Sequence, residues 1–309
     1  MTRWGIVSTI KAPLEAIQAF AAHHLELGAH RILIYLDDPD PETEAALRAH
    51  SKVRVRACDR AYWKASGQNR PKKHQPRQTY NASQAYATTK DVDWLCHIDV
   101  DEFLWSDGNI SGLLDAQPDS TRTARVRPME LLSGSDTAYK AWIPPGPNRD
   151  RITTRLYPTF GGFLKGGFLS HVAGKVFVRT GMAPVTFKIH NVFLGEEMNP
   201  GLVEPDAVNL LHRHAPDWDE WKSTFHFRME QGSYRPELDP NRPREKGGLR
   251  MHELFTAIEA DGGEKGLQAF FGEVCQDTPR LRAALEAEGL LRICDLDLAR
   301  KTAQQFGSG

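Results

Sequence analysis

Three carboxylates lie within four positions, at Asp99, Asp101 and Glu102, inside an otherwise apolar segment that runs from Trp94 to Trp105 (WLCHIDVDEFLW). A buried carboxylate is costly unless it is paired or holds a metal ion, so this cluster needs an explanation. Side chains alternate in an extended chain, which directs Asp99 and Asp101 to the same side. Two hard oxygen donors suit Mg²⁺ or Mn²⁺, which keep coordination positions open for phosphate oxygens. The alternative is a strand end that turns acidic where it meets water.

The composition limits the class of protein. With 309 residues, 40% of them hydrophobic, the chain is long enough for one large domain or two smaller ones. A formal net charge of −1 creates no global field for nucleic acid or an anionic membrane. The cysteines form no CxxC pair, which argues against a zinc site and a disulfide framework and fits a reducing compartment. They are Cys58, Cys96, Cys275 and Cys294.

The N-terminal residues lack the long apolar stretch and the cleavage site of a signal peptide. No window approaches the ~18 uninterrupted apolar residues of a transmembrane helix. The sequence therefore predicts a soluble, cytoplasmic protein without a transmembrane segment and without a nucleic-acid partner.

Strands and helices alternate through the first hundred residues, which is typical of an open, largely parallel α/β sheet. Strands are expected at 4–10, 31–36, 53–57 and 94–98, and helices at 13–28, 40–50 and 77–90. In such sheets ligands bind beyond the carboxyl ends of the strands. Asp37, Asp38, Asp99 and Asp101 all follow strand ends.

The segment from Arg60 to Arg77 is basic and has no acidic residue. Its glycine and prolines predict an irregular loop. One interpretation is a solvated loop. The other is a mobile flap over a polyphosphate, since Lys and Arg pair with phosphate oxygens. The basic residues are Arg60, Lys64, Arg70, Lys72, Lys73 and Arg77.

The second half is less regular. Short strands are expected at 122–127, 175–179 and 185–189, and a turn or loop at 131–136. From about Arg250 the composition predicts amphipathic helices. The simplest organisation is a catalytic domain, 1–230, with a mostly helical extension, 231–309, packed on it.

His212 and His214 differ in context from the other histidines, because they alternate on an extended stretch after an apolar pair. A neutral imidazole can add a metal ligand beside carboxylates. His190 is a weaker candidate. The glycine-rich segment Gly161–Gly167 has neither Walker A nor dinucleotide spacing, so it predicts a flexible loop. Lys165, His171 and Lys175 are available near that loop.

Several segments in order resemble the family-2-like glycosyltransferases of bacteria, which are related to the family-92 type and have a GT-A fold. The specific one is QTYNASQAYATTKDVDWLCHIDVDEFLW, similar to a family helix followed by "DWL…DvDEFL". AAHHLELGAHRILIYLDD, VRPMELLSGSD, AGKVFVR and LLHRHAPDWDEWK are weaker matches, and the resemblance covers roughly residues 4 to 225. The chain departs from the family after the first strand (Thr9-Ile10-Lys11), at Arg213 and at 128–131.

The resemblance implies a metal-dependent glycosyltransferase, of hexosyltransferase type, that moves a sugar from a nucleotide-diphosphate sugar to an acceptor hydroxyl. It implies inversion of configuration, a UDP-sugar as first expectation, and a role in polysaccharide or glycoconjugate synthesis with a glycan or other hydroxyl acceptor. Asp101 would bind Mn²⁺ or Mg²⁺ directly, Asp99 through water or by holding the ribose, and His212 as third ligand.

The remaining roles follow in the same way. Asp37 or Asp38 would contact base or ribose, and Thr9 would line that pocket. Lys73 and Arg77 would contact the donor phosphates. Glu130 is the candidate general base, and Glu102 would orient the cluster.

Two alternatives remain open. A phosphatase of the haloacid dehalogenase type also uses Asp-x-Asp, but it places its nucleophile at the end of the first strand, where this chain has Ser8-Thr9. A non-catalytic nucleotide- or sugar-binding module with the same fold is the second.

Overall fold

The computed structural model describes residues 2–241 and 243–307, and these divide into two compact units. Unit 1 consists of the described residues of 1–127, 173–210 and 296–309. Unit 2 consists of 128–172 and of the described residues of 211–295. The predicted catalytic domain and extension, 1–230 and 231–309, stay a prediction.

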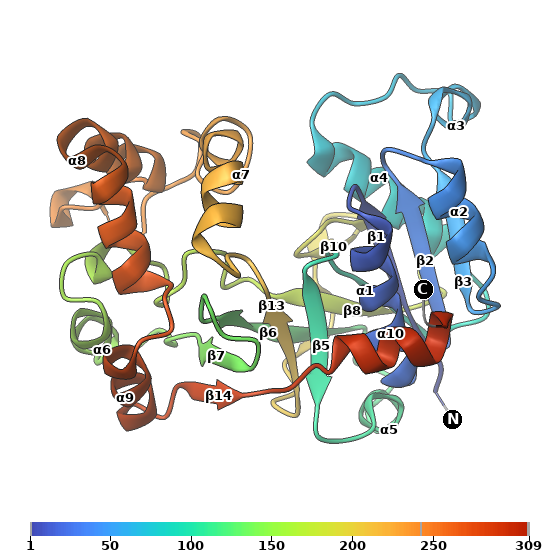
Figure 1. Ribbon diagram of the computed structural model, residues 1–309. Helices are drawn as coiled ribbons and strands as arrows, with labels where there is room; N and C mark the ends of the chain where they lie inside the picture. Colours follow the sequence, from blue (N-terminus) through green and yellow to red (C-terminus); the bar gives the residue numbers. More distant parts are fainter. Residues whose placement is uncertain (1, 242, 308–309) are drawn as a thin grey trace. The chain divides into compact units, whose positions relative to one another are not determined.

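Unit 1 contains the alternating strands and helices of the N-terminal half, and Figure 1 labels them. Its elements are β1 (Trp4–Ile10), α1 (Leu14–Glu26), β2 (Arg31–Leu36), α2 (Pro41–Arg48), β3 (Val53–Ala57), α3 (Arg60–Ala65), α4 (His74–Thr88), β4 (Trp94–His97), β5 (Glu102–Ser106), α5 (Ile110–Asp115), β8 (Lys175–Arg179), β9 (Val185–Phe187), β10 (Val192–Leu194), β11 (Glu197–Met198), β12 (Leu202–Val203) and α10 (Leu298–Phe306). Strands β6 (Thr123–Leu131) and β13 (Val208–His212) begin in unit 1 and end in unit 2.

The sheet of unit 1 has the order β6-β8-β4-β1-β2-β3. Strands β4, β1, β2 and β3 are parallel, whereas β8 runs antiparallel to both β4 and β6. The prediction of an open, mostly parallel α/β sheet flanked by helices, with a helical C-terminal part, is confirmed. The chain passes from β1 outward through β2 to β3 and then returns to β4 on the other side of β1. Such a reversal of strand order is where open α/β sheets bind ligands.

Helix α4 covers one face of this sheet through small side chains. Ala82 and Ala85 of α4 lie in one buried cluster with Val7, Leu33 and Leu95 of three neighbouring strands. Side chains alternate along a strand, so the neighbours of these residues in each strand point to the opposite face of the sheet. The apolar runs of β1, β2 and β4 are thus buried on both faces, as expected of parallel strands covered by helices.

The prediction of an irregular loop over the basic segment 60–77 is wrong for its first part, because residues 60–65 form α3. The Asp59 carboxylate accepts the backbone N–H of Tyr62 (2.8 Å) and so begins the helix. Trp63 is buried and donates its indole N–H to the Cys58 carbonyl (3.1 Å). The capping aspartate lies just outside the basic segment, which is why composition alone missed the helix. The following helix, α4, begins at His74 rather than at Arg77.

Unit 2 combines a small antiparallel sheet with helices. Its further elements are β7 (Ala138–Ala141), α6 (Arg149–Leu156), η1 (Gly161–Phe163), α7 (Trp218–Glu230), η2 (Arg244–Lys246), α8 (Met251–Val274), α9 (Pro279–Ala287) and β14 (Leu291–Ile293). Strand β7 pairs with the end of β6 and with β14. The core is aromatic, with a connected series of ring contacts that joins Phe271, Trp221, Phe225, Phe255 and Phe270. In the described part of the chain, no helix is both long and apolar enough to cross a membrane.

The C-terminal helix α10 lies against α1 (Figure 1), and two buried histidines of α1 lie beside this contact. His24 donates from Nδ1 to the Phe20 carbonyl (2.8 Å) and accepts the Leu104 N–H at Nε2 (3.1 Å). The Leu104 N–H can only donate a hydrogen bond, so His24 Nε2 carries no proton and the imidazole is neutral. His23 donates from Nε2 to the Leu104 carbonyl (2.7 Å), and its Nδ1 lies 3.2 Å from the Lys301 ammonium.

We expect acid to destabilise unit 1 through these histidines. Burial lowers the pKa of His23 from 6.5 to about 4. Burial, and then the repulsion that a protonated His23 would exert, hold the pKa of His24 well below 6.5. Both are neutral in the folded chain, whereas the unfolded chain binds protons below about pH 6.5. Stability is therefore fully present above that pH and is lost as pH falls toward 4, by up to about 1.4 kcal/mol per pH unit for each histidine.

Urea unfolding at pH 7, 6 and 5 measures this loss. The His23→Gln variant keeps a hydrogen-bond donor and an acceptor at this position. It should remove the contribution of one of the two histidines to the slope of the unfolding free energy against pH. An unchanged slope in that variant would contradict the assignment.

Candidate active site

The acidic segment forms a turn, and two hydrogen bonds join its ends, Asp99 and Glu102. The Glu102 N–H donates to the Asp99 carbonyl (3.1 Å), and the Asp99 N–H donates to the Glu102 carboxylate (2.9 Å). Glu102 is fully buried at the start of β5, whereas Asp99 and Asp101 are only half-buried. The turn therefore uses Glu102 as an internal support, and it leaves Asp99 and Asp101 as its partly exposed carboxylates.

Lys175, the first residue of β8, neutralises part of this acidic turn. Its fully buried ammonium lies 2.7 Å from Asp99 Oδ2 and 2.9 Å from Glu102 Oε2. Burial alone lowers the pKa of Lys175, but the two carboxylates more than offset this and raise it. Burial alone raises the pKa of Asp99, and the Lys175 charge reverses this to hold it well below its usual range. Asp99 is thus a stable carboxylate at neutral pH, and Gln78 of α4 donates to its other oxygen (2.5 Å).

The charge balance of this turn fits a divalent cation. Three carboxylates (Asp99, Asp101, Glu102) and one ammonium (Lys175) leave a formal charge of −2, which one divalent ion would balance. The Asp99 side chain remains 31% exposed although both of its oxygens are engaged. A carboxylate has about four lone-pair positions, so these contacts leave room for coordination. Oxygen donors of this kind suit Mg²⁺ or Mn²⁺.

At the end of β2, Asp37 anchors the basic segment. Arg77 donates to both Asp37 oxygens (2.8 and 2.6 Å), and Arg70 donates to one of them (3.1 Å). Burial raises the pKa of Asp37, and the bonds from Arg77 outweigh this and lower it. Arg77 also donates to the carbonyls of Pro71 and Lys72, at 2.8 Å each. These bonds tie residues 70–72 to the carboxyl end of the sheet.

Around that anchor, three predicted contact residues differ in exposure. Lys73 is exposed and directly precedes α4. Asp38 is exposed and pairs with Lys11 (2.9 Å) at the surface. Thr9, near the end of β1, is buried and accepts from Asn81 (3.1 Å), which in turn accepts from the Tyr62 hydroxyl (2.7 Å).

Thr9, Asp37 and Asp99 therefore lie at the carboxyl ends of three adjacent strands, β1, β2 and β4. The register supports this, because Ile10 is opposite Leu36 and Val7 is opposite His97. Sequence reasoning placed Lys175 near a flexible loop and did not predict its pairing with Asp99. The available signal was a lysine that heads an apolar strand, KVFVR.

In unit 2, Glu130 is a buried and fully engaged carboxylate. It accepts the backbone N–H groups of Leu169 (3.1 Å) and Ser170 (2.7 Å) and lies 3.0 Å from the Lys140 ammonium. Burial raises the pKa of Glu130, and Lys140 with these donors lowers it below its usual value. The contacts show that Glu130 organises residues 169–170. Its role as general base stays a prediction.

The predicted histidine ligand also lies in unit 2, in a row of three imidazoles. The ring centroids of His171 and His212 are 5.2 Å apart, and those of His212 and His214 are 5.1 Å apart. His214 Nε2 lies 3.0 Å from the Tyr234 hydroxyl and 3.1 Å from Arg228 Nη1. Burial, and then the Arg228 charge, hold the pKa of His214 well below 6.5. His212 as a metal ligand stays a prediction.

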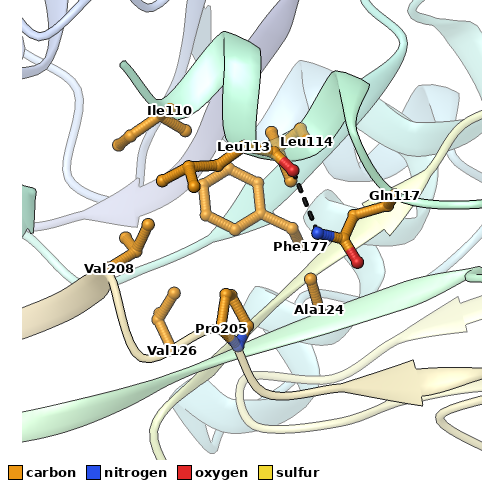
Figure 2. Close-up of a pocket in the computed structure, with 9 residues that line it drawn as sticks. All are labelled: Ile110, Leu113, Leu114, Gln117, Ala124, Val126, Phe177, Pro205 and Val208. Atoms are coloured by element: carbon orange, nitrogen blue, oxygen red, sulfur yellow. Dashed lines mark hydrogen bonds between the residues drawn. The ribbon is translucent and has the colours of Figure 1, made fainter. Parts of the chain in front are cut away.

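A small apolar cavity in unit 1 is no substrate site. Figure 2 shows its lining side chains, which come from α5, the sheet and the segment at 205–208, with Gln117 donating to the Leu113 carbonyl (3.0 Å). Its volume is only ≈ 10 Å³. Its lining residues are Ile110, Leu113, Leu114, Gln117, Ala124, Val126, Phe177, Pro205 and Val208.

Comparison with known proteins gives only weak structural likenesses. No family model matches the chain, and no curated protein does. Matched solved structures include HddC from Yersinia pseudotuberculosis (10% identity, TM-score 0.38, covering 74% of this chain and 100% of that one) and the galactosyltransferase LgtC (13%, 0.30, 57% of each). The glycosyltransferase GlyE of Streptococcus pneumoniae also matches (13%, 0.28), but the match spans only 41% of this chain and 30% of GlyE. TM-scores this low support no argument about mechanism.

Proposed function

We propose that the chain is a glycosyltransferase of the GT-A type that moves a sugar from a nucleotide-diphosphate sugar to an acceptor hydroxyl with the help of Mn²⁺ or Mg²⁺. The observation that carries the proposal is the turn at 99–102. It combines two half-exposed carboxylates, a residual charge of −2 and a position at the point where the strand order reverses. A diphosphate with a divalent ion is the chemistry that this combination suits best.

Each residue of unit 1 then has a defined task. Asp99 and Asp101 would hold the ion, which supplies positive charge for the leaving diphosphate when bound. Lys175 keeps Asp99 ionised, and Glu102 orients it by accepting the Asp99 N–H. The Asp37–Arg77 pair fixes residues 70–72 of the basic segment, so that exposed Lys73 can contact donor phosphate. Thr9 would line the pocket for the ribose. Asp38, the exposed carboxylate at the end of β2, would contact the base or the ribose.

The roles of unit 2 in transfer are part of the same proposal. Glu130 is the candidate base for an inverting reaction, and His212 is the candidate third ligand. Product configuration, read by NMR from the anomeric coupling constant, tests inversion directly. We also propose a UDP-sugar donor, a glycan or other hydroxyl acceptor, and a place in polysaccharide or glycoconjugate synthesis.

The proposal is tested by thermal shift with UDP-, GDP- and CMP-linked sugars, each with Mn²⁺ and with EDTA. One nucleotide sugar should raise the melting temperature only with the metal, because a ligand at a hundred times its Kd stabilises by ~2.7 kcal/mol. The same donor should then be hydrolysed or transferred. No metal-dependent shift with any donor would contradict the proposal. A shift without turnover would favour the alternative, a non-catalytic nucleotide- or sugar-binding module.

A further inference from the structure

We propose that unit 2 carries a binding site for a neutral saccharide, in a cavity lined by the start of α7 and the C-terminal half of α8. The cavity has a volume of ≈ 370 Å³. Small-molecule sites have volumes of about 300–1,000 Å³, so this one lies within that range. Its lining residues are Ser133, Gly134, Asp217, Trp218, Gln268, Phe271 and Gln276.

Trp218 provides a rigid aromatic surface in this cavity. Its ring is held by Trp221 (centroids 5.4 Å apart, planes at 37°) and by the edge of Phe271 (5.4 Å, 77°). The side chain is nevertheless only half-buried. The face of an indole is electron-rich and attracts C–H groups that carry partial positive charge. A pyranose ring presents such C–H groups on its faces, and a fixed indole binds them at little cost in side-chain entropy.

Polar side chains surround this indole. Asp217 is exposed and caps α7 through a single bond from the Glu220 N–H (2.8 Å), which uses only part of its acceptor capacity. Gln268 and Gln276 are exposed, and each amide can donate and accept. A hydroxyl group likewise donates and accepts. The lining therefore matches a ligand with one apolar ring face and several hydroxyls.

Other ligand classes fit less well. Among the described residues, no lysine or arginine lines the cavity, and the Asp217 carboxylate would repel an anion. Lys222 lies 5.5 Å from the Trp218 ring centroid, but its ammonium is paired with Glu264 (2.7 Å). A quaternary ammonium ion is the main rival, because an aromatic ring and a carboxylate attract cations. The two glutamine amides favour hydroxyls instead. The inference does not depend on sugar transfer by this chain.

The test measures binding of glucose, galactose, N-acetylglucosamine and a β-linked glucose trimer to the full chain by saturation-transfer NMR and calorimetry. Galacturonate and choline serve as charged probes. The variants are Gln268→Ala, Asp217→Asn and Trp218→Ala. Asparagine is also a good helix cap, so Asp217→Asn keeps α7 capped. Gln84→Ala, at an exposed position of α4 in unit 1, is the matched control for Gln268→Ala.

We expect at least one neutral sugar to bind, with Kd raised about tenfold or more by Trp218→Ala and about threefold by Gln268→Ala and Asp217→Asn. Gln84→Ala should leave Kd unchanged. Binding of choline alone, binding of galacturonate in preference to neutral sugars, or equal Kd values in wild type and the Gln268 and Asp217 variants would overturn the inference. Absence of sugar binding in wild type would do so as well. Donor turnover, measured in parallel, reports on the proposed function separately.

Discussion

Replacing Asp101 by asparagine should reduce metal-dependent turnover of the donor sugar by about 100-fold or more, because a neutral amide is a poor ligand for a divalent ion. Asp101 is half-buried in the turn that Glu102 and Lys175 hold, so the fold should survive the change. The measurements are kcat/KM with Mn²⁺ and the affinity for Mn²⁺ by calorimetry. Both should fall together.

The control for this prediction is Asp107→Asn, which removes an exposed carboxylate just beyond β5. It should keep both the Mn²⁺ affinity and the activity of the wild type. Near-normal turnover by Asp101→Asn would refute the assignment of the metal to this turn. Loss of activity with unchanged Mn²⁺ affinity would give Asp101 a role other than coordination.

Replacing Lys140 by methionine should destabilise unit 2 by about 3–5 kcal/mol, the usual cost of leaving one partner of a buried ion pair alone. Lys140 is fully buried, lies 3.0 Å from Glu130 and donates to the Val274 carbonyl (2.7 Å). Its loss would leave the ionised Glu130 carboxylate buried without its cation. Urea unfolding gives the change in free energy.

A second variant separates charge from packing in this pair. Glu130→Gln combined with Lys140→Met removes both charges and should recover part of the lost stability. Lys222→Met removes the cation of a partly exposed pair in the same unit (2.7 Å to Glu264) and should cost less than about 1 kcal/mol. A Lys140→Met variant as stable as Lys222→Met would show that the buried pair contributes little.

Local sequence patterns were sufficient for most elements of the first hundred residues, but not for α3. The apolar runs of β1, β2 and β3 have the predicted bounds, and Asp40 caps α2 by accepting the Thr43 N–H (2.8 Å) as a capping residue should. These features depend on neighbours within a few positions, which the sequence displays directly. Helix α3 was missed because its one local signal, the Asp59 cap, was hidden by the composition of the segment that follows.

The pairing of charged residues could not be predicted, because it joins residues far apart in sequence. Asp37 is 40 positions from Arg77, which donates to both of its oxygens, and its contact with a base or ribose stays a prediction. Glu130 appeared to be a possible base, and only the packing of β7 reveals Lys140 beside it. Burial and pKa direction follow from such partners, and no local pattern encodes them.

By itself, the sequence determined the class of fold and the acidic cluster at 99–102, because strand–helix alternation and an acidic cluster in apolar surroundings are local properties. The extended chain expected at Asp99–Asp101 is wrong, because the structure has a turn there, closed by the bond from the Glu102 N–H to the Asp99 carbonyl. Tertiary structure alone decided which of the three carboxylates support the turn and which face outward. It brought Lys175 across 76 positions to Asp99, and also to Glu102, through the antiparallel pairing of β4 and β8. A buried ammonium must be neutralised, and both carboxylates do this, Glu102 from a fully buried position and Asp99 from a half-buried one.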